Sequence, residues 1–365
     1  MSRPLRIAFF GSSLVSAYWN GACTYYRGMI RALAQHGHAV TFYEPDALER
    51  QQNRDIEDPP WASVHVYAVP SAAAVHDVVA RAAAQADVVV KASGVGVYDE
   101  VLEAAVLETR QPGARVILWD VDAPATLTRM ESDPGDSLRA LVPHFDLVFT
   151  YGGGERVIRR YEALGARRCE TIYNALDPTT HHPVPREPRY RADLSALVNR
   201  LPDRESRVEE YFFSAVAALP GRSFLLAGTG WADRVREENL RYLGHLPPGE
   251  HNTFNCSPLA VLNVTRDSMV ANGFSPATRV FEAAGAGACI ISDSWDGLDE
   301  FLEPEREVLA CATGAEVVSA LEELDAARAH RIGNAARRRI LTEHTYAHRA
   351  RQVEAILAEE GAGLR

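Results

Sequence analysis

Residues 259–300 contain the feature that most restricts the fold, two short apolar runs separated by one amphipathic helix. The first run, Leu259–Val264, and the second, Ala288–Ser292, have the length and composition of buried strands. Between them, small apolar residues recur at helical spacing from Val280 to Ala284. Two buried strands joined by a helix form one unit of a parallel sheet, so this stretch predicts an α/β fold.

The ends of this helix are marked by its neighbours in sequence. Ser275 and Pro276 predict its start, because a hydroxyl side chain at the N-cap and proline at the first helical position are both favoured. Gly285 and Gly287 predict its end. A helix that follows a parallel strand begins at the carboxyl ends of the strands, and α/β sheets bind their ligands at that edge.

The start of the helix predicts a nucleotide site. Its first backbone N–H groups, around Thr278 and Arg279, attract an anion such as phosphate together with the helix dipole. One turn further, the carboxylate of Glu282 can accept hydrogen bonds from both hydroxyls of a ribose. We therefore expect a nucleoside diphosphate against Ser275, Thr278, Arg279 and Glu282. The alternative is a core helix on which Arg279 and Glu282 form a solvated ion pair.

Composition excludes several classes of function. The 365 residues, 47% of them hydrophobic, suffice for two domains with real cores. A net charge of -11 argues against nucleic acid and anionic membrane surfaces as main partners. No apolar stretch reaches the length of a membrane span, and the run that follows Arg3 and Arg6 is too short for a signal peptide. The five cysteines are scattered, which indicates reduced thiols in a cytoplasmic protein.

The first half of the chain continues the alternation of strands and helices. Strands are expected at 6–11, 38–43, 87–91, 115–119 and 145–150, and helices at 22–37, 72–85, 98–108, 123–130 and from 155 onward. This order predicts a doubly wound domain over residues 1–180. The loop 11–21 lacks the Gly-x-Gly-x-x-Gly spacing, so a dinucleotide site is not expected there.

A segment with four prolines, residues 177–190, separates this domain from a second α/β series over residues 190–344. We interpret His181 and His182 in this segment as solvated side chains. The second series has expected helices at 204–219, 315–321 and 326–341 and expected strands at 223–227 and 241–243. Residues 345–365 then contain a lone amphipathic helix that has no partner strand.

Two arginines and a glycine extend the predicted nucleotide site. Arg200 and Arg204 open the second series, and their guanidinium groups suit a diphosphate whose charge grows as it leaves. The alternative is a solvated helix start. Gly230 follows a strand in a Gly-Thr-Gly sequence and suits a base or phosphate contact, or only a turn at the end of the strand.

Asp120 and Asp122 form an Asp-x-Asp sequence after an expected strand. A hard cation needs more oxygen ligands than these two carboxylates supply, so we expect no metal site. We assign Asp122 instead as an acceptor-substrate contact or general base. The alternative is a loop residue that caps the helix over 123–130.

The arrangement resembles the GT-B glycosyltransferases, two Rossmann-like halves with the nucleotide signature in the second. Residues 173–183 resemble the Asn-x-x-Asp-x-x-x-x-x-Pro segment that closes the first domain in many of these enzymes. Residues 199–204 lie where the family places a basic pair for the donor diphosphate. Residues 275–300 and 343–346 resemble most the CgeB-like branch, first associated with spore maturation. The resemblance covers most of the C-terminal half, and the N-terminal half mainly in architecture.

The resemblance implies two Rossmann-like doubly wound domains that face a cleft. It implies a metal-independent hexosyltransferase that needs no cofactor, takes a nucleotide-diphosphate sugar, with UDP as our first choice, and transfers the sugar to a hydroxyl or amine. Arg200, Arg204 and Arg279 would stabilise the diphosphate, and Glu282 would hold the ribose. The helix at 345–365 would pack back on the first domain.

One departure from the family is visible. Many retaining members have an acidic residue eight positions before the ribose-binding glutamate, and Phe274 stands there in this chain. The family's sugar-contacting carboxylate is therefore not assigned to any residue of this chain. The resemblance then does not say whether the reaction retains or inverts the configuration of the sugar. Two other functions share this architecture or its binding site, a nucleotide-sugar 2-epimerase and a non-catalytic nucleotide-binding or spore-coat assembly protein.

Overall fold

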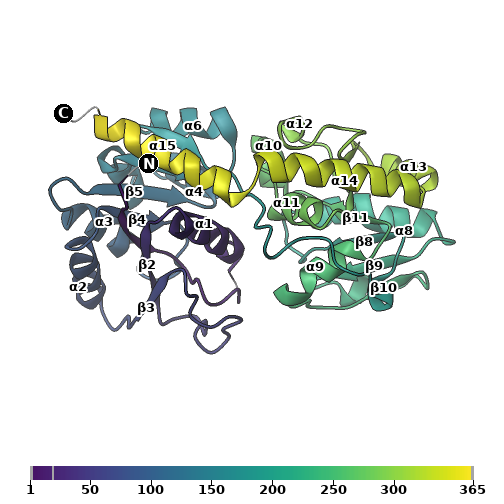
Figure 1. The fold of residues 1–365 in the computed structure, drawn as a ribbon, viewed down its shortest axis with the longest axis horizontal. Coiled ribbons are helices and arrows are strands. Elements are labelled where there is room, and N and C mark those ends of the chain that lie inside the picture. Colours follow the sequence, from purple (N-terminus) through teal and green to yellow (C-terminus); the bar gives the residue numbers. More distant parts are fainter. Residues whose placement is uncertain (1–2, 19, 363–365) are drawn as a thin grey trace. The chain divides into compact units, whose positions relative to one another are not determined.

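The computed structural model describes residues 3–18 and 20–362, which divide into two compact units (Figure 1). The first unit comprises residues 1–173 and 346–365, and the second comprises residues 174–345. The predicted helix at 345–365 extends past the described residues by its last three positions. The expected boundary at residue 180 differs from this division, because residues 174–180 pack with the second unit.

The first unit is built on a parallel sheet that has seven strands in the described chain, in the order β3-β2-β1-β4-β5-β6-β7. Its strands are β1 (Arg6–Phe10), β2 (Ala39–Pro45), β3 (Ser63–Tyr67), β4 (Val88–Ala92), β5 (Arg115–Asp120), β6 (Leu147–Thr150) and β7 (Cys169–Thr171). Its helices are α1 (Cys23–Gln35), α2 (Ala72–Ala83), α3 (Asp99–Glu108), α4 (Ala123–Ser132), α5 (Ser137–Leu141), α6 (Gly154–Ala163) and α15 (Tyr346–Ala362).

The second unit repeats this plan with six parallel strands in the described chain, in the order β10-β9-β8-β11-β12-β13. Its strands are β8 (Leu194–Leu197), β9 (Phe224–Ala227), β10 (Leu240–Tyr242), β11 (Ala260–Asn263), β12 (Cys289–Asp293) and β13 (Leu309–Cys311). Its helices are α7 (Glu205–Val208), α8 (Ser214–Ala218), α9 (Pro248–Cys256), α10 (Asp267–Asn272), α11 (Thr278–Gly285), α12 (Leu298–Phe301), α13 (Gly314–Glu323) and α14 (Ala326–Glu343).

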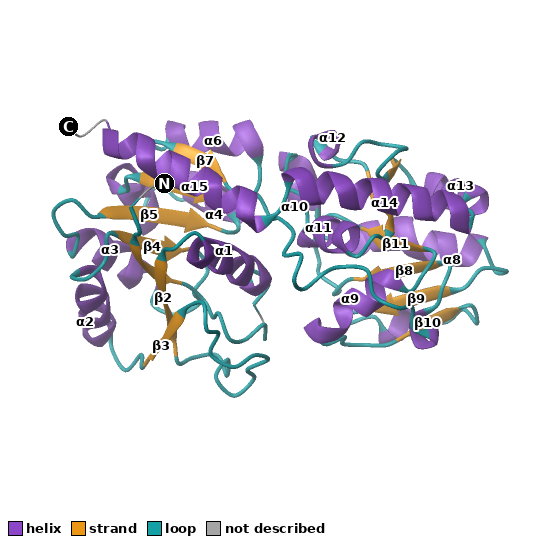
Figure 2. Ribbon diagram, viewed as in Figure 1, coloured by secondary structure: helices purple, strands orange, loops and turns teal. Residues whose placement is uncertain are grey.

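Both sheets confirm the predicted doubly wound α/β class. The central strands are buried on both faces, as their near-continuous apolar sequences require, and helices surround the strands of each sheet (Figure 2). In each unit the chain builds strands toward one edge and then returns to build toward the other. The reversal falls between β1 and β4 in the first sheet and between β8 and β11 in the second.

Several short elements are missing from the sequence-based description, namely β3, β7, β8, β13, α5, α9, α10 and α12. β3, β7 and β13 lie at sheet edges and are only three to five residues long, so they lack the apolar run that marks a central strand. β8 is central but has only four residues, one of them a serine, and this run is too short to stand out in the sequence. The helix expected over 204–219 consists of α7, a π-helical turn at Glu209–Phe213 and α8.

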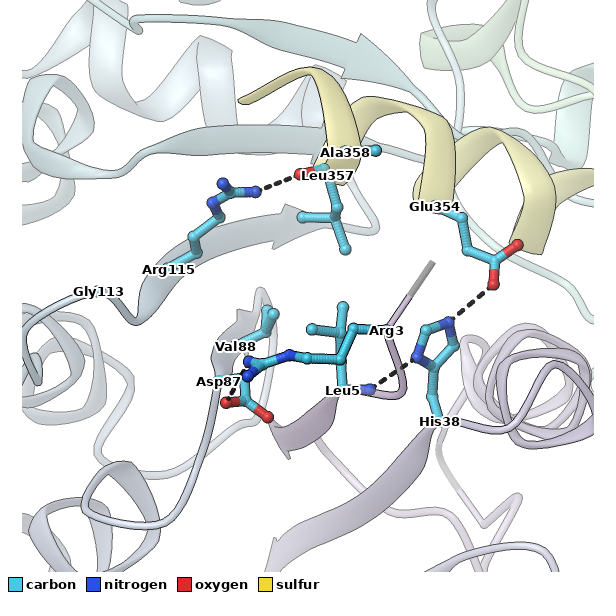
Figure 3. Close-up of a pocket in the computed structure, with 10 residues that line it drawn as sticks. All are labelled: Arg3, Leu5, His38, Asp87, Val88, Gly113, Arg115, Glu354, Leu357 and Ala358. Atoms are coloured by element: carbon cyan, nitrogen blue, oxygen red, sulfur yellow. Dashed lines mark hydrogen bonds and ion pairs between the residues drawn. The ribbon is translucent and has the colours of Figure 1, made fainter. Parts of the chain in front are cut away.

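The last helix, α15, belongs to the first unit and packs on α1. The carboxylate of Glu354 bridges His36 (Nδ1–Oε2 2.8 Å) and His38 (Nε2–Oε1 2.9 Å). Below this helix lies a cavity of about 300 Å³ (Figure 3). The charged groups that line it are already paired, since Arg3 binds Asp87 and Arg115 donates to the carbonyl of Leu357. Among the helices of the described chain, none is long and apolar enough to cross a membrane.

Candidate functional site

The candidate site lies in the second unit at the carboxyl ends of β8 and β11. The chain leaves these two neighbouring strands toward opposite edges of the sheet, and such a reversal point is where open α/β sheets bind ligands. Arg204 follows β8, Arg266 follows β11, and Arg279 lies in the first turn of α11. The positive charges of Arg266 and Arg279 both act on Arg204, so three guanidinium groups converge on one region.

Arg204 is the one of these three arginines whose guanidinium group makes no hydrogen bond to a described residue. Its Nε atom is buried without a hydrogen-bond partner, and no ion pair to its side chain is found among the described residues. Burial, followed by the charge of Arg266, lowers the pKa of Arg204 to about 10, so the group remains charged at neutral pH. A buried cation without a counter-ion is costly. The site is therefore suited to an anionic ligand.

Arg200 has a different environment from the one expected. Its guanidinium group binds Asp233 (Nη1–Oδ1 2.8 Å) and Glu205 (Nη2–Oε1 2.5 Å) and lies over the ring of Trp231. The hydrogen bond to Glu205, followed by that to Asp233, raises the pKa of Arg200. A diphosphate would have to compete with both carboxylates, so the role of Arg200 stays a prediction and Arg204 is the better candidate.

The start of α11 differs from the prediction. The helix begins at Thr278 and not at Pro276, and the Ser275 hydroxyl donates to the carbonyl of Gly273 (2.8 Å) and does not cap the helix. The prediction of Ser275 as N-cap is wrong, because Ala277 has an extended backbone conformation and is itself the N-cap. Since the first amides of a helix lack acceptors within it, the amides of Thr278 and Arg279 are the ones placed for an anion.

The loop before α11 is fixed by backbone contacts. Gly273 and Phe274 both have positive φ (68° and 47°), and the Phe274 amide donates to the carbonyl of Asp296 (2.6 Å). A Cβ atom on Gly297 would lie 2.3 Å from the Phe274 ring, so this ring packs directly on the neighbouring loop. The side chain at position 274 thus has a packing role.

Glu282 is buried, with 7% of its surface exposed. Burial by itself would raise the pKa of Glu282, but the nearby groups of His181, Arg279 and His251 outweigh it and lower the pKa. The carboxylate is therefore ionised inside the protein. The alternative of a solvated ion pair with Arg279 is wrong, because Glu282 is buried and Arg279 donates to Asn255 Oδ1 (3.2 Å).

Sequence reasoning missed the role of three polar residues of this site. His251 and Asn255 lie on α9, and this helix was not predicted. Burial lowers the pKa of His251 to about 4, and its Nε2–H donates to the carbonyl of Leu246 (3.1 Å). His181 is 8% exposed, so its interpretation as a solvated residue is wrong. In the sequence, these three residues can be recognised only as polar residue types, and the residue type does not reveal whether a side chain is buried.

The segment that follows the first unit holds α11 in place. Asn174 donates to the carbonyl of Pro276 (3.4 Å), and the Leu176 amide donates to the carbonyl of His344 (2.8 Å). A Cβ atom on Gly285 would lie 2.3 Å from Leu176, so only glycine allows this close approach. These contacts place residues 174–180 in the second unit.

Gly230 lies in the loop after β9 and has a φ of 93°. A Cβ atom there would lie 2.9 Å from the Cβ of Arg200. The glycine therefore permits the turn that supports Arg200, and its predicted contact with a nucleotide stays a prediction.

Asp120 and Asp122 lie in the first unit and have different surroundings. Asp120 is buried and accepts hydrogen bonds from Ser93 Oγ (2.7 Å), Thr126 Oγ1 (3.0 Å), the Tyr161 hydroxyl and the Asp122 amide. Asp122 occupies the N-cap position of α4, but its side chain makes no capping hydrogen bond. Within the described residues, no group of three or more His, Cys, Asp or Glu side chains is arranged to hold a metal ion.

Comparisons with known proteins agree with this fold. The family model described as "Glycosyl transferase-like" matches residues 204–355. No curated protein matches the sequence. Among solved structures, sucrose-phosphate synthase from Thermosynechococcus elongatus is similar, with 15% identity, a TM-score of 0.72 and coverage of 99% of this chain and 100% of that chain.

Two further structures extend this likeness. HepE from Anabaena, in complex with UDP-glucose, has 14% identity and a TM-score of 0.67 over 97% of this chain and 100% of that chain. AviGT4, a glycosyltransferase involved in avilamycin A biosynthesis, has 18% identity and a TM-score of 0.63 over 99% of each chain. The chain thus consists of two parallel-sheet Rossmann-like units and has the GT-B fold of glycosyltransferases.

Proposed function

We propose that the protein is a glycosyltransferase that takes its sugar from a nucleoside-diphosphate sugar. The proposal rests on one observation: a group of arginines and a buried carboxylate occur together at the start of α11. The Arg204 guanidinium, which makes no ion pair to a described residue, lies with Arg266 and Arg279, and the ionised Glu282 carboxylate lies one turn further along α11. Cations followed by a buried acceptor match a diphosphate followed by a ribose.

The roles of the residues follow from this pairing. Arg204, Arg279 and the first amides of α11 would bind the diphosphate, whose negative charge grows as the bond to the sugar breaks. Glu282 would hold the ribose by accepting a hydrogen bond from one of its hydroxyls. If the reaction inverts, Asp122 is our choice of general base, and if it retains, the leaving phosphate can take the acceptor proton.

The finer assignments are part of the proposal. UDP is our first choice of nucleotide because HepE, which has the same fold, was solved with UDP-glucose. We propose a metal-independent hexosyltransferase in the cytoplasm, related most closely to the CgeB-like branch on the basis of residues 275–300. The acceptor is a hydroxyl or an amine.

The test combines a ligand panel with one variant. The diphosphates of uridine, guanosine, thymidine and adenosine, and their sugars, are screened by thermal unfolding. A ligand at a hundred times its dissociation constant stabilises by about 2.7 kcal/mol. For the nucleotide that binds, we expect Glu282→Ala to bind 10- to 100-fold more weakly, because charge-assisted hydrogen bonds are worth about 1.5–3 kcal/mol each.

Glu300→Ala is the matched control, since Glu300 is an exposed carboxylate of the same unit on α12. It should bind the nucleotide as the wild type does. Calorimetry in which Glu282→Ala also retains wild-type affinity would remove the ribose site from α11. Turnover of the sugar nucleotide without an acceptor would identify an epimerase and contradict the transferase proposal.

A further inference from the structure

We infer that His181 is a second ribose-binding group, whose Nε2 accepts a hydrogen bond from one ribose hydroxyl beside Glu282. This inference rests on the proposed function. It adds to the donor site a residue of the segment that precedes the second sheet.

The position of His181 is fixed by the backbone around it. Its amide donates to the carbonyl of Asp177 (3.2 Å). Its own carbonyl oxygen would lie 3.0 Å from a Cβ atom on Gly285, so this segment packs tightly against α11. The imidazole is 8% exposed and interacts electrostatically with Glu282 and His251. His181 is therefore held in a fixed position in the surroundings of Glu282.

The contacts of the imidazole fit one tautomer. The Thr180 hydroxyl donates to the carbonyl of Asp177 (3.1 Å) and also contacts His181 Nδ1 (3.0 Å). With the hydroxyl proton directed to the carbonyl, the hydroxyl oxygen accepts from Nδ1–H, and we assign the imidazole this tautomer. In the neutral imidazole, Nε2 then carries the free lone pair and is a hydrogen-bond acceptor.

This acceptor has no partner in the protein. His181 Nε2 is buried and makes no hydrogen bond to any described residue. Buried polar atoms are nearly always hydrogen-bonded, so an orphaned acceptor indicates a missing donor. The ionised carboxylate of Glu282 is itself only an acceptor and cannot supply one.

A vicinal diol is the ligand chemistry that fits two neighbouring acceptors. Each ribose hydroxyl can donate one proton, so one can donate to Glu282 and the other to His181 Nε2. A phosphate has no proton to donate when fully ionised and would not satisfy either group. The chemistry at these two residues therefore points to the ribose, while Arg204 and its neighbours point to the diphosphate.

The test measures binding by the full chain to UDP, 2′-deoxy-UDP, 3′-deoxy-UDP and pyrophosphate. The wild type should bind one of the deoxy analogues about 3- to 10-fold more weakly than UDP through loss of the hydrogen bond to His181. His181→Phe removes the acceptor. We expect it to bind UDP about 3- to 10-fold more weakly than wild type and to bind that deoxy analogue as tightly as UDP.

Three measurements separate binding from folding. Pyrophosphate affinity should be unchanged in His181→Phe, because pyrophosphate has no ribose. His181→Gln should restore part of the discrimination, since its Oε1 atom can accept near the position of Nε2. His182→Phe, a change at the exposed neighbouring histidine, should bind all four ligands as the wild type does.

The failures are distinguishable. If His181→Phe retains the wild-type ratio between UDP and both deoxy analogues, the inference is overturned while the proposed function stands. If the wild type binds pyrophosphate but none of the nucleoside diphosphates in the panel, the proposed function itself is overturned.

Discussion

Two arginines that are four residues apart in the sequence have opposite electrostatic situations in the structure. Arg200 is held by Asp233 and Glu205, whereas Arg204 is partly buried and has no ion pair in the described chain. A charge that the protein leaves uncompensated costs stability. Such a cost at the reversal point of a sheet is typical of a ligand site, where function and stability are in conflict.

We therefore predict that Arg204→Ala lowers turnover about 100-fold and weakens donor binding less, because the diphosphate gains charge in the transition state. Its thermal midpoint without ligand should not fall, since the substitution removes an uncompensated charge. Steady-state kinetics and thermal unfolding test both parts.

Arg200→Ala is the comparison for this prediction. It should reduce turnover less than Arg204→Ala does, because its guanidinium group is engaged by two carboxylates. A larger loss in Arg200→Ala than in Arg204→Ala would show that Arg200 leaves Asp233 and Glu205 to bind the diphosphate.

At the scale of elements, the contact between α1 and α15 completes the first unit. Gly28 of α1 is buried, and a Cβ atom on it would lie 2.1 Å from the ring of Tyr346, the first residue of α15. The first residue of the last helix thus packs where only glycine leaves room for its ring. Tyr346 lies 318 residues after Gly28 in the sequence (346 − 28), so this is a long-range contact.

Gly28→Ala should destabilise the protein by about 1–3 kcal/mol through overpacking against Tyr346, even though alanine favours a helix by about 1 kcal/mol over glycine. In a Tyr346→Ala background, the same substitution should be neutral or stabilising, because the clash is gone. Thermal unfolding of the four proteins forms a double-mutant cycle. Equal effects of Gly28→Ala in both backgrounds would contradict the proposed packing.

At the scale of the whole molecule, we propose that arginines and a helix start supply the counter-charge for the donor. Arg204, Arg266 and Arg279 converge on the site. We predict that activity persists after exhaustive chelation of divalent cations, because these groups can neutralise a diphosphate without a metal. Assays with and without chelator test this, and a complete loss that manganese or magnesium restores would contradict it.

The sequence by itself predicted the class of fold and the position of the central unit. The strands on either side of α11 and the helix itself are defined by local apolar periodicity, and the structure places them within about two residues of the expected bounds. Glu282 and Arg279 could be named as candidate site residues because a helix after a parallel strand begins at the binding edge of the sheet.

Only the tertiary structure decided which polar groups are buried, paired or left without a partner. Arg279 donates a hydrogen bond to Asn255, which lies 24 residues away, and Arg266 donates one to Asp203, which lies 63 residues away. His181 looked like a solvated linker residue until its segment was seen packed against α11. Local sequence determines helices and strands because their hydrogen bonds and apolar faces repeat over a few residues. The electrostatics of a site depend on burial and on distant partners, and these exist only once the chain has folded.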